Sequence, residues 1–283
     1  MSEPRYPYVH VDVTPEEVDE VSYLLWELGA LGVEERDAST LNKQAAASDV
    51  TLVASFDDDA AAQEAIAQLA PREARFEHVV GDAWREAYKQ YFKVTRLGPR
   101  LVIRPSWEPY TPGAGDVVVT VDPGRAFGTG THESTRLLMA ALDERVRGGE
   151  RVLDVGCGTG ILAICALKLG AQHALCIDVD QDAVEVTREN ALSNEVQDRV
   201  EAATTDVADV PDSYPLVLAN IQATVLIPLA LPIAARVQSG GLLFMSGILL
   251  GQEQDVLAAY PGFTLLASPK EGEWTALILK KAA

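Results

Sequence analysis

The sequence contains few cysteines, and they form no metal-binding or disulfide pattern. Cys157, Cys165 and Cys176 include no Cys-x-x-Cys pair, so we expect reduced packing residues rather than disulfides or metal ligands. The four histidines are scattered along the chain. We therefore predict no metal site.

Long apolar runs are missing as well. No stretch approaches the roughly 18 consecutive apolar residues that span a bilayer. Residues 1–6 also lack the apolar core of a signal peptide. We therefore expect a cytoplasmic protein with no membrane contact.

Positive charge is scarce. The 283 residues include 23 Lys and Arg against 42 Asp and Glu, which gives a formal net charge of −19. Such a surface disfavours phosphate backbones and attracts basic proteins, so no direct nucleic-acid partner is expected. An equally open interpretation is that the acidic surface only confers solubility, or reflects a salty or acid environment.

The length suits two domains. Apolar alternation and helix-capping patterns predict a β-α-β-β-α-β order in the first part of the chain. The expected elements are residues 6–13, 14–28, 33–36, 50–56, 57–69 and 74–80. This order predicts a small ferredoxin-like α+β domain over residues 1–81.

The rest of the chain predicts a linker and a larger domain. An aromatic-rich segment at residues 84–92 suggests a linker over residues 82–98, although these aromatics could equally pack on a neighbouring domain. Residues 99–283 alternate strands and helices, among them a helix expected over residues 225–237 and a strand expected at residues 242–246. This order predicts a mostly parallel sheet covered by helices. Apolar segments at residues 263–267 and 274–279 predict a terminal antiparallel hairpin.

A glycine-rich turn marks a candidate ligand site. Residues 151–160 read Arg-Val-Leu-Asp-Val-Gly-Cys-Gly-Thr-Gly. Gly156, Gly158 and Gly160 allow a sharp turn and a close approach of the backbone to a ligand, because a Cβ would obstruct both. The helix expected at residues 161–169 would direct free N–H groups at an anionic group. A flexible strand-to-helix turn is the simpler alternative for this motif alone.

An acidic residue follows at a spacing typical of ribose recognition. Residues 173–180 predict a second buried strand that ends in acid, about 20 residues after the glycine turn. The Asp178 carboxylate could accept hydrogen bonds from both ribose hydroxyls, each worth about 1.5–3 kcal/mol. Asp180 is expected instead to cap the next helix.

Two motifs carry a resemblance to a known family. The Gly-x-Gly-x-Gly spacing, preceded by Asp154, resembles S-adenosylmethionine-dependent methyltransferases of the Rossmann-like class. Residues 122–135 read Asp-Pro-Gly-Arg-Ala-Phe-Gly-Thr-Gly-Thr-His-Glu-Ser-Thr, which closely resembles the signature of the ribosomal protein L-eleven methyltransferase family. The resemblance covers nearly the whole chain, including residues 104–107, 219–221 and 246–249. It implies a seven-stranded methyltransferase domain, preceded by a small substrate-recognition domain.

The resemblance also implies S-adenosylmethionine as the cofactor. Thr135, Gly156, Asp178 and Asn220 match the family positions that contact it. The complete set of candidate cofactor-binding residues is Phe127, Thr135, Gly156, Gly158, Gly160, Asp178 and Asn220. Phe127 and Trp274 are candidates for pocket walls, although core packing is favoured for both.

Asn220 is the predicted catalytic residue. An amine acceptor must lose a proton, and a lysine with a pKa near 10.4 costs roughly 4 kcal/mol to deprotonate at neutral pH. A dry pocket beside a positive sulfonium would lower that pKa. We hypothesise that no dedicated base is required. The Asn220 side-chain oxygen and a backbone carbonyl would then orient the amine lone pair.

The resemblance implies a protein-lysine N-methyltransferase, and we expect this enzyme to be a monomer. Its substrate would be ribosomal protein L-eleven, a basic protein, modified at lysine side chains and at the amino terminus. A close alternative is the related lysine methyltransferase of the electron-transfer flavoprotein beta subunit. A small-molecule methyltransferase and a catalytically silent binding module would also fit the glycine turn and the acid. The additional first domain disfavours a methyltransferase that acts on a small molecule. The presence of Asp178 and Asn220 disfavours a module that binds the cofactor without catalysing a reaction.

Overall fold

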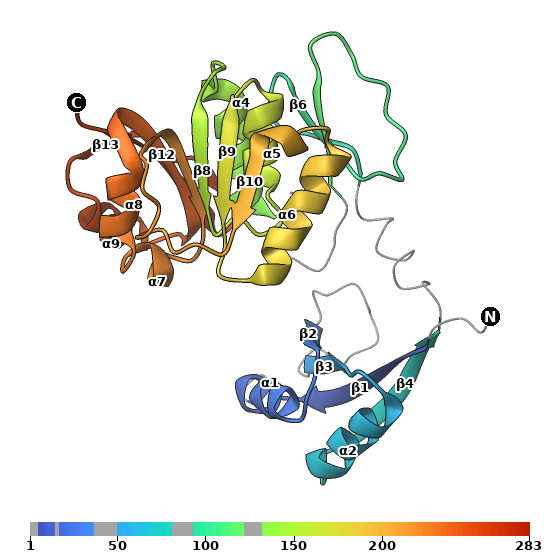
Figure 1. The fold of residues 1–283 in the computed structure, drawn as a ribbon. Coiled ribbons are helices and arrows are strands. Elements are labelled where there is room, and N and C mark those ends of the chain that lie inside the picture. The colour runs from blue at the N-terminus through green and yellow to red at the C-terminus, as the bar shows by residue number, and fades with distance from the viewer. Residues whose placement is uncertain (1–4, 15–16, 37–49, 81–92, 122–131) are drawn as a thin grey trace. The chain divides into compact units, whose positions relative to one another are not determined.

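The computed structural model describes residues 5–14, 17–36, 50–80, 93–121 and 132–283. The chain divides into two compact units, Met1–Tyr91 and Phe92–Ala283 (Figure 1). The boundaries predicted after residues 81 and 98 stay predictions. Each unit is described by itself below.

The smaller unit is an antiparallel sheet with two helices. Its elements are β1 (Arg5–Val13), α1 (Val18–Glu27), β2 (Gly32–Arg36), β3 (Val50–Ser55), α2 (Asp59–Leu69) and β4 (Ala74–Val80). The strands are ordered β2-β3-β1-β4, and every neighbouring pair is antiparallel. Strand β1 therefore lies inside the sheet, between β3 and β4.

Alternation along β1 builds the core of this unit. Val9, Val11 and Val13 are buried, because every second residue of a strand faces the same side. Leu25 of α1 and Leu69 of α2 pack into the same cluster. The cluster explains why one face of each helix is apolar.

The larger unit is built on a mixed sheet (Figure 1). Its strands are β8 (Arg151–Val155), β9 (His173–Ile177), β10 (Val200–Ala203), β11 (Tyr214–Asn220), β12 (Val237–Leu249), β13 (Phe263–Ala267) and β15 (Trp274–Lys281). They are ordered β10-β9-β8-β11-β12-β15-β13, and β14 (Lys270–Glu271) also pairs with β15. The first five strands in this order are parallel, and β15 runs antiparallel to both of its neighbours in it.

Helices cover both faces of this sheet. They are α4 (Glu133–Arg145), α5 (Ile161–Lys168), α6 (Gln181–Ser193), η1 (Gln197–Arg199), α7 (Ala223–Leu226), α8 (Ala230–Arg236) and α9 (Glu253–Ala259). Helices α4, α5 and α6 share one apolar cluster with residues such as Leu216 and Leu218. Helices α7, α8 and α9 share another with Val217 and Ala219. Neighbouring residues of β11 therefore face opposite helical layers.

A small three-stranded sheet is attached to α4. It consists of β5 (Thr95–Arg96), β6 (Leu101–Arg104) and β7 (Val117–Thr120). The buried Asp143 carboxylate on α4 accepts hydrogen bonds from the Arg100 side chain at 2.8 Å and from the backbone N–H groups of Arg100 and Leu101 at 2.8 and 3.0 Å. Burial opposes ionisation of Asp143, but these hydrogen bonds outweigh it and hold its pKa below the ordinary value.

Two expected elements differ from those observed. The single helix expected over residues 225–237 is divided into α7 and α8. Pro228 lies between them and has no N–H group to continue the helical ladder. The strand expected at residues 242–246 is extended at both ends, as β12. This strand contains Gly240 and Gly241. Glycine has a low β-propensity, so the sequence predicts a strand that begins only after them.

Candidate functional site

One cavity of about 680 Å³ lies at the carboxyl ends of the parallel strands. Five of the predicted site residues line it, namely Thr135, Gly156, Gly158, Asp178 and Asn220. Phe127 lies outside the described residues. Ligands of open α/β sheets bind at this edge, so the position suits a cofactor.

Gly156 forms the turn that follows β8. Its φ of +69° lies in the left-handed region, and its N–H donates to the Ile177 carbonyl at 2.8 Å. A Cβ at this position would lie 2.5 Å from Cγ2 of Ile221. The glycine therefore allows the loops after β8 and β11 to meet at the floor of the cavity.

Gly160 has a different role from Gly156. It is the N-cap of α5, with φ of +73°, and a Cβ there would lie 2.7 Å from Cγ2 of Thr187 on α6. Gly160 does not line the cavity. The structure gives it a packing role between α5 and α6, and a direct cofactor contact stays a prediction.

Asp178 is held in position immediately after β9. Its Oδ2 accepts from the Gly158 N–H at 2.9 Å, and its Oδ1 accepts from the Asp180 N–H at 3.1 Å. Each carboxylate oxygen has a second lone pair that can accept a further hydrogen bond. Asp180 accepts from the Asp182 N–H at 2.9 Å, which confirms it as a helix N-cap.

Asn220 and Thr135 meet although 85 residues separate them in the sequence. Asn220 ends β11, and its Nδ2 donates to Thr135 Oγ1 at 3.0 Å. This bond fixes the rotation of the Asn220 amide. Because the amide nitrogen is directed at Thr135, the amide oxygen is directed away from it.

The first turn of α4 places Thr135. The N-cap of this helix is His132, whose Nδ1 accepts from the Ser134 N–H at 3.3 Å. The His132 ring also contacts Trp274 edge to face, with ring centroids 4.9 Å apart. Both rings line the cavity, so Trp274 contributes to the cavity wall.

Asp154 is a residue whose importance the sequence reasoning missed. It is buried in β8, directly before the glycine turn. Its Oδ2 accepts from the Ala163 N–H at 3.2 Å, while Oδ1 has no hydrogen-bond partner among the described residues. Burial, with a smaller contribution from the Asp178 charge, raises the pKa of Asp154 to about 7. An acid within an otherwise apolar strand was the available signal.

The three cysteines are free and buried, as expected for packing residues. Cys157 also lines the cavity. Among the residues that the structure describes, no group of three or more His, Cys, Asp or Glu is placed to hold a metal ion. The helices of the same described ranges are all too short or too polar to cross a bilayer.

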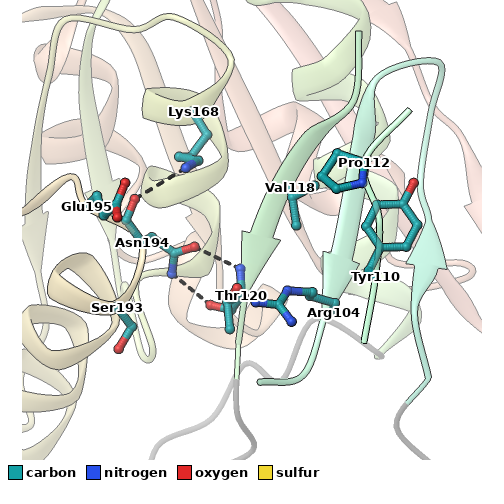
Figure 2. A pocket seen from close by; sticks show the side chains of 9 residues that line it. All are labelled: Arg104, Tyr110, Pro112, Val118, Thr120, Lys168, Ser193, Asn194 and Glu195. Atoms are coloured by element: carbon teal, nitrogen blue, oxygen red, sulfur yellow. Dashed lines mark hydrogen bonds between the residues drawn. The ribbon is translucent and has the colours of Figure 1, made fainter. Parts of the chain in front are cut away.

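A second, smaller cavity of about 280 Å³ lies between β6, β7 and the ends of α5 and α6 (Figure 2). The Asn194 amide exchanges two hydrogen bonds with the Thr120 backbone, and Lys168 donates to the Asn194 carbonyl at 3.3 Å. Arg104 donates to the Glu108 carbonyl at 3.1 Å. The Asn194–Thr120 bonds join the small sheet to the end of α6, and the Lys168 and Arg104 bonds each lie within one side of the cavity, so these polar lining residues have structural partners.

Comparisons with known proteins agree on one family. The family model described as "Ribosomal protein L11 methyltransferase (PrmA)" matches residues 5–282. A Sorangium cellulosum protein of that name is 48% identical over 276 residues, covering 95% of this chain and 86% of the relative. A Geobacter metallireducens relative is 47% identical over 197 residues, covering 69% of this chain and 65% of its own length.

A solved structure supports the same grouping. The crystal structure of a ribosomal protein L11 methylase from Lactobacillus delbrueckii subsp. bulgaricus matches with a TM-score of 0.63 and 31% identity. The match covers 68% of this chain and all of that chain. The similarity therefore extends from sequence to fold.

Proposed function

The chain belongs to the ribosomal protein L11 methyltransferase family, and we propose that it methylates lysine side chains and the amino terminus of ribosomal protein L11. The enzyme is a methyltransferase that depends on S-adenosylmethionine. The observation that supports the site assignment is the convergence of Thr135, Gly156, Asp178 and Asn220 on one cavity. These residues come from α4 and from the ends of three neighbouring strands.

The described residues fit this cofactor. The volume of about 680 Å³ lies within the range of small-molecule sites. The absence of a Cβ at Gly156 lets the turn after β8 pack against Ile221, and both residues line the cavity. We assign the ribose hydroxyls to the Asp178 carboxylate, and the remaining contacts to Thr135, Gly158 and Asn220. Contacts by Phe127 and Gly160 are part of the same proposal.

Asn220 is the proposed catalytic residue. When bound, S-adenosylmethionine supplies a methyl group whose carbon–sulfur bond breaks, leaving the electron pair on sulfur, as a carbon–nitrogen bond forms. The chain's task is then to present a neutral amine in line with that bond. Thr135 holds the Asn220 amide so that its oxygen can accept a hydrogen bond from the incoming amine. The apolar part of the lining favours the neutral amine by desolvation.

We also propose the finer description of the fold. The strand order and the antiparallel β15 support a Rossmann-like seven-stranded methyltransferase domain over residues 99–283. The β-α-β-β-α-β order and the β2-β3-β1-β4 sheet support a ferredoxin-like domain over residues 1–81. We assign substrate recognition to this smaller domain, with residues 82–98 as the linker. A monomeric, cytoplasmic enzyme without a nucleic-acid or membrane partner completes the proposal.

Incubation with labelled S-adenosylmethionine tests the substrate. Purified L11 from cells that lack this activity should become labelled on lysines and on its amino terminus. Electron-transfer flavoprotein beta subunit and a small-molecule extract serve as the competing acceptors. Label confined to either competitor would refute the proposed substrate.

An Asn220→Ala variant tests the catalytic assignment. We expect turnover to fall about 100-fold, because the amine is no longer held in line. Calorimetry with S-adenosylhomocysteine should show a smaller loss, of about tenfold or less, because Asn220 supplies only one of several proposed cofactor contacts. Thr264→Ala, at an exposed position of β13, is the matched control and should retain full turnover. Normal turnover by Asn220→Ala would remove Asn220 from the mechanism.

A further inference from the structure

The order of the strands gives the cavity two distinct ends. Asp178 follows β9, Gly156 follows β8, Asn220 ends β11, Gly247 lies in β12 and Trp274 begins β15. These strands are neighbours in that order. Because β15 is antiparallel to β12, its first residue lies at the edge where the parallel strands end. Trp274 is therefore on the opposite side of Asn220 from Asp178.

Trp274 is fixed firmly at this end. It pairs with Leu249 of β12 and with Glu271 of β14. Its indole contacts the His132 ring at an interplanar angle of 68°. His132 is the N-cap of α4, so the two rings form a wall attached to the helix that carries Thr135.

An ion pair strengthens this attachment. Arg136, on α4, pairs with Glu271, three residues before Trp274. The pair joins the β14–β15 turn to the first turns of α4. The strand pairings and the ion pair hold the backbone that carries Trp274, and the contact with the His132 ring packs against one edge of its indole.

We propose that Trp274, supported by His132, is the positioning residue that binds and orients the acceptor amine. This inference rests on the proposed function, because the end of the cavity at Asp178 is then assigned to the cofactor. An indole can pack along the apolar stem of a lysine, neutral or charged, and it attracts the cationic head of an amine that has not yet lost its proton or is already methylated. A methylated ammonium is less hydrated than a primary one, so the same wall should hold partly methylated amines for the next transfer.

Binding of a methylated amine tests the wall without requiring turnover. The probe is trimethyl-lysine amide, added to protein saturated with S-adenosylhomocysteine and measured by calorimetry. Trp274→Leu should weaken probe binding about tenfold, and Trp274→Phe should weaken it less. Phe263→Leu, on β13 beside Tyr260, is the matched control and should bind like the wild type. Affinity for S-adenosylhomocysteine should stay within about twofold in all four proteins, which also shows that each one folds.

Kinetics with L11 separate this inference from the proposed function. Trp274→Leu should raise KM for L11 and lower the mean number of methyl groups per modified amine. If Trp274→Leu and the wild type have equal probe affinity, KM and product distribution, Trp274 does not position the amine, while the proposed function stands. A wild type that binds the probe through Trp274 but does not methylate L11 would support the wall and refute the proposed substrate. Absence of probe binding by the wild type would refute the proposal that Trp274 binds the amine.

Discussion

At the scale of single residues, Asp154 is the least expected feature of the site. It is a buried carboxylate with one partnered oxygen and one unpartnered oxygen within the described part of the chain. Its position supports the N-terminal turn of α5 through the Ala163 N–H. A neutral hydrogen-bonding side chain would make the same contact without a buried charge.

The raised pKa of Asp154 predicts a specific dependence of stability on pH. The folded protein binds the Asp154 proton up to about pH 7, whereas the unfolded chain releases it near pH 3.8. Between these pH values the folded protein therefore binds more protons than the unfolded chain. The stability that protonated Asp154 contributes is lost as the pH rises through that range. Each pH unit within the range is worth about 1.4 kcal/mol, so the total effect is a few kcal/mol.

Asp154→Asn should remove this dependence. We expect the variant to gain stability relative to wild type between pH 5 and pH 8, with the difference levelling off above about pH 7. Urea unfolding at several pH values measures it, and Asp182→Asn, at an exposed position of α6, is the control. Parallel profiles for Asp154→Asn and wild type would show that Asp154 is ionised in the folded protein throughout.

At the scale of elements, the glycine turn after β8 packs against α6 in addition to its proposed role in ligand binding. The Cβ that Gly160 lacks would meet Thr187 of α6 at 2.7 Å. The Thr187 hydroxyl in turn donates to the Gly158 carbonyl at 2.9 Å. The turn after β8 and helix α6 are therefore fitted to each other.

Gly160→Ala should lower the free energy of unfolding by about 2–5 kcal/mol. The left-handed backbone costs an alanine about 1–2 kcal/mol, and the collision with Thr187 adds about 1–3 kcal/mol. Gly251→Ala is the matched control, because Gly251 also has a positive φ but nothing lies within 4 Å of its missing Cβ. Adding Thr187→Ser, which removes the colliding methyl group, should recover part of the loss. Equal losses at Gly160 and Gly251 would show that the helices absorb the extra atom.

Local patterns predicted the elements better than they predicted long-range contacts. The period of apolar residues is visible in the sequence, so β1, β8, β9 and their helices were expected near their observed positions. To predict the division between α7 and α8, Pro228 would have had to count for more than the apolar pattern that continues through it. The Asn220–Thr135 hydrogen bond joins distant segments. The family resemblance placed both residues at the cofactor, but no local pattern predicts a bond between them.

At the scale of the whole molecule, charge is the dominant property. The net charge of −19 comes from nearly twice as many acidic as basic residues. An electrostatic field of this kind accelerates association with a basic partner, and salt screens it over about 10 Å at 0.1 M ionic strength. Contacts inside the cavity proposed to bind the cofactor are screened less because they are partly buried.

Salt should therefore affect binding of the protein substrate and binding of the demethylated cofactor product differently. If the acidic surface attracts L11, kcat/KM for L11 should fall at least tenfold between about 0.02 M and 0.5 M NaCl. S-adenosylhomocysteine has no net charge, so its dissociation constant over the same range should change by less than about threefold. Initial-rate kinetics and calorimetry measure the two quantities in the same buffers. A kcat/KM for L11 that is unchanged by salt would mean that the acidic surface serves solubility rather than capture of the substrate, because steering by net charge cannot persist when that charge is screened.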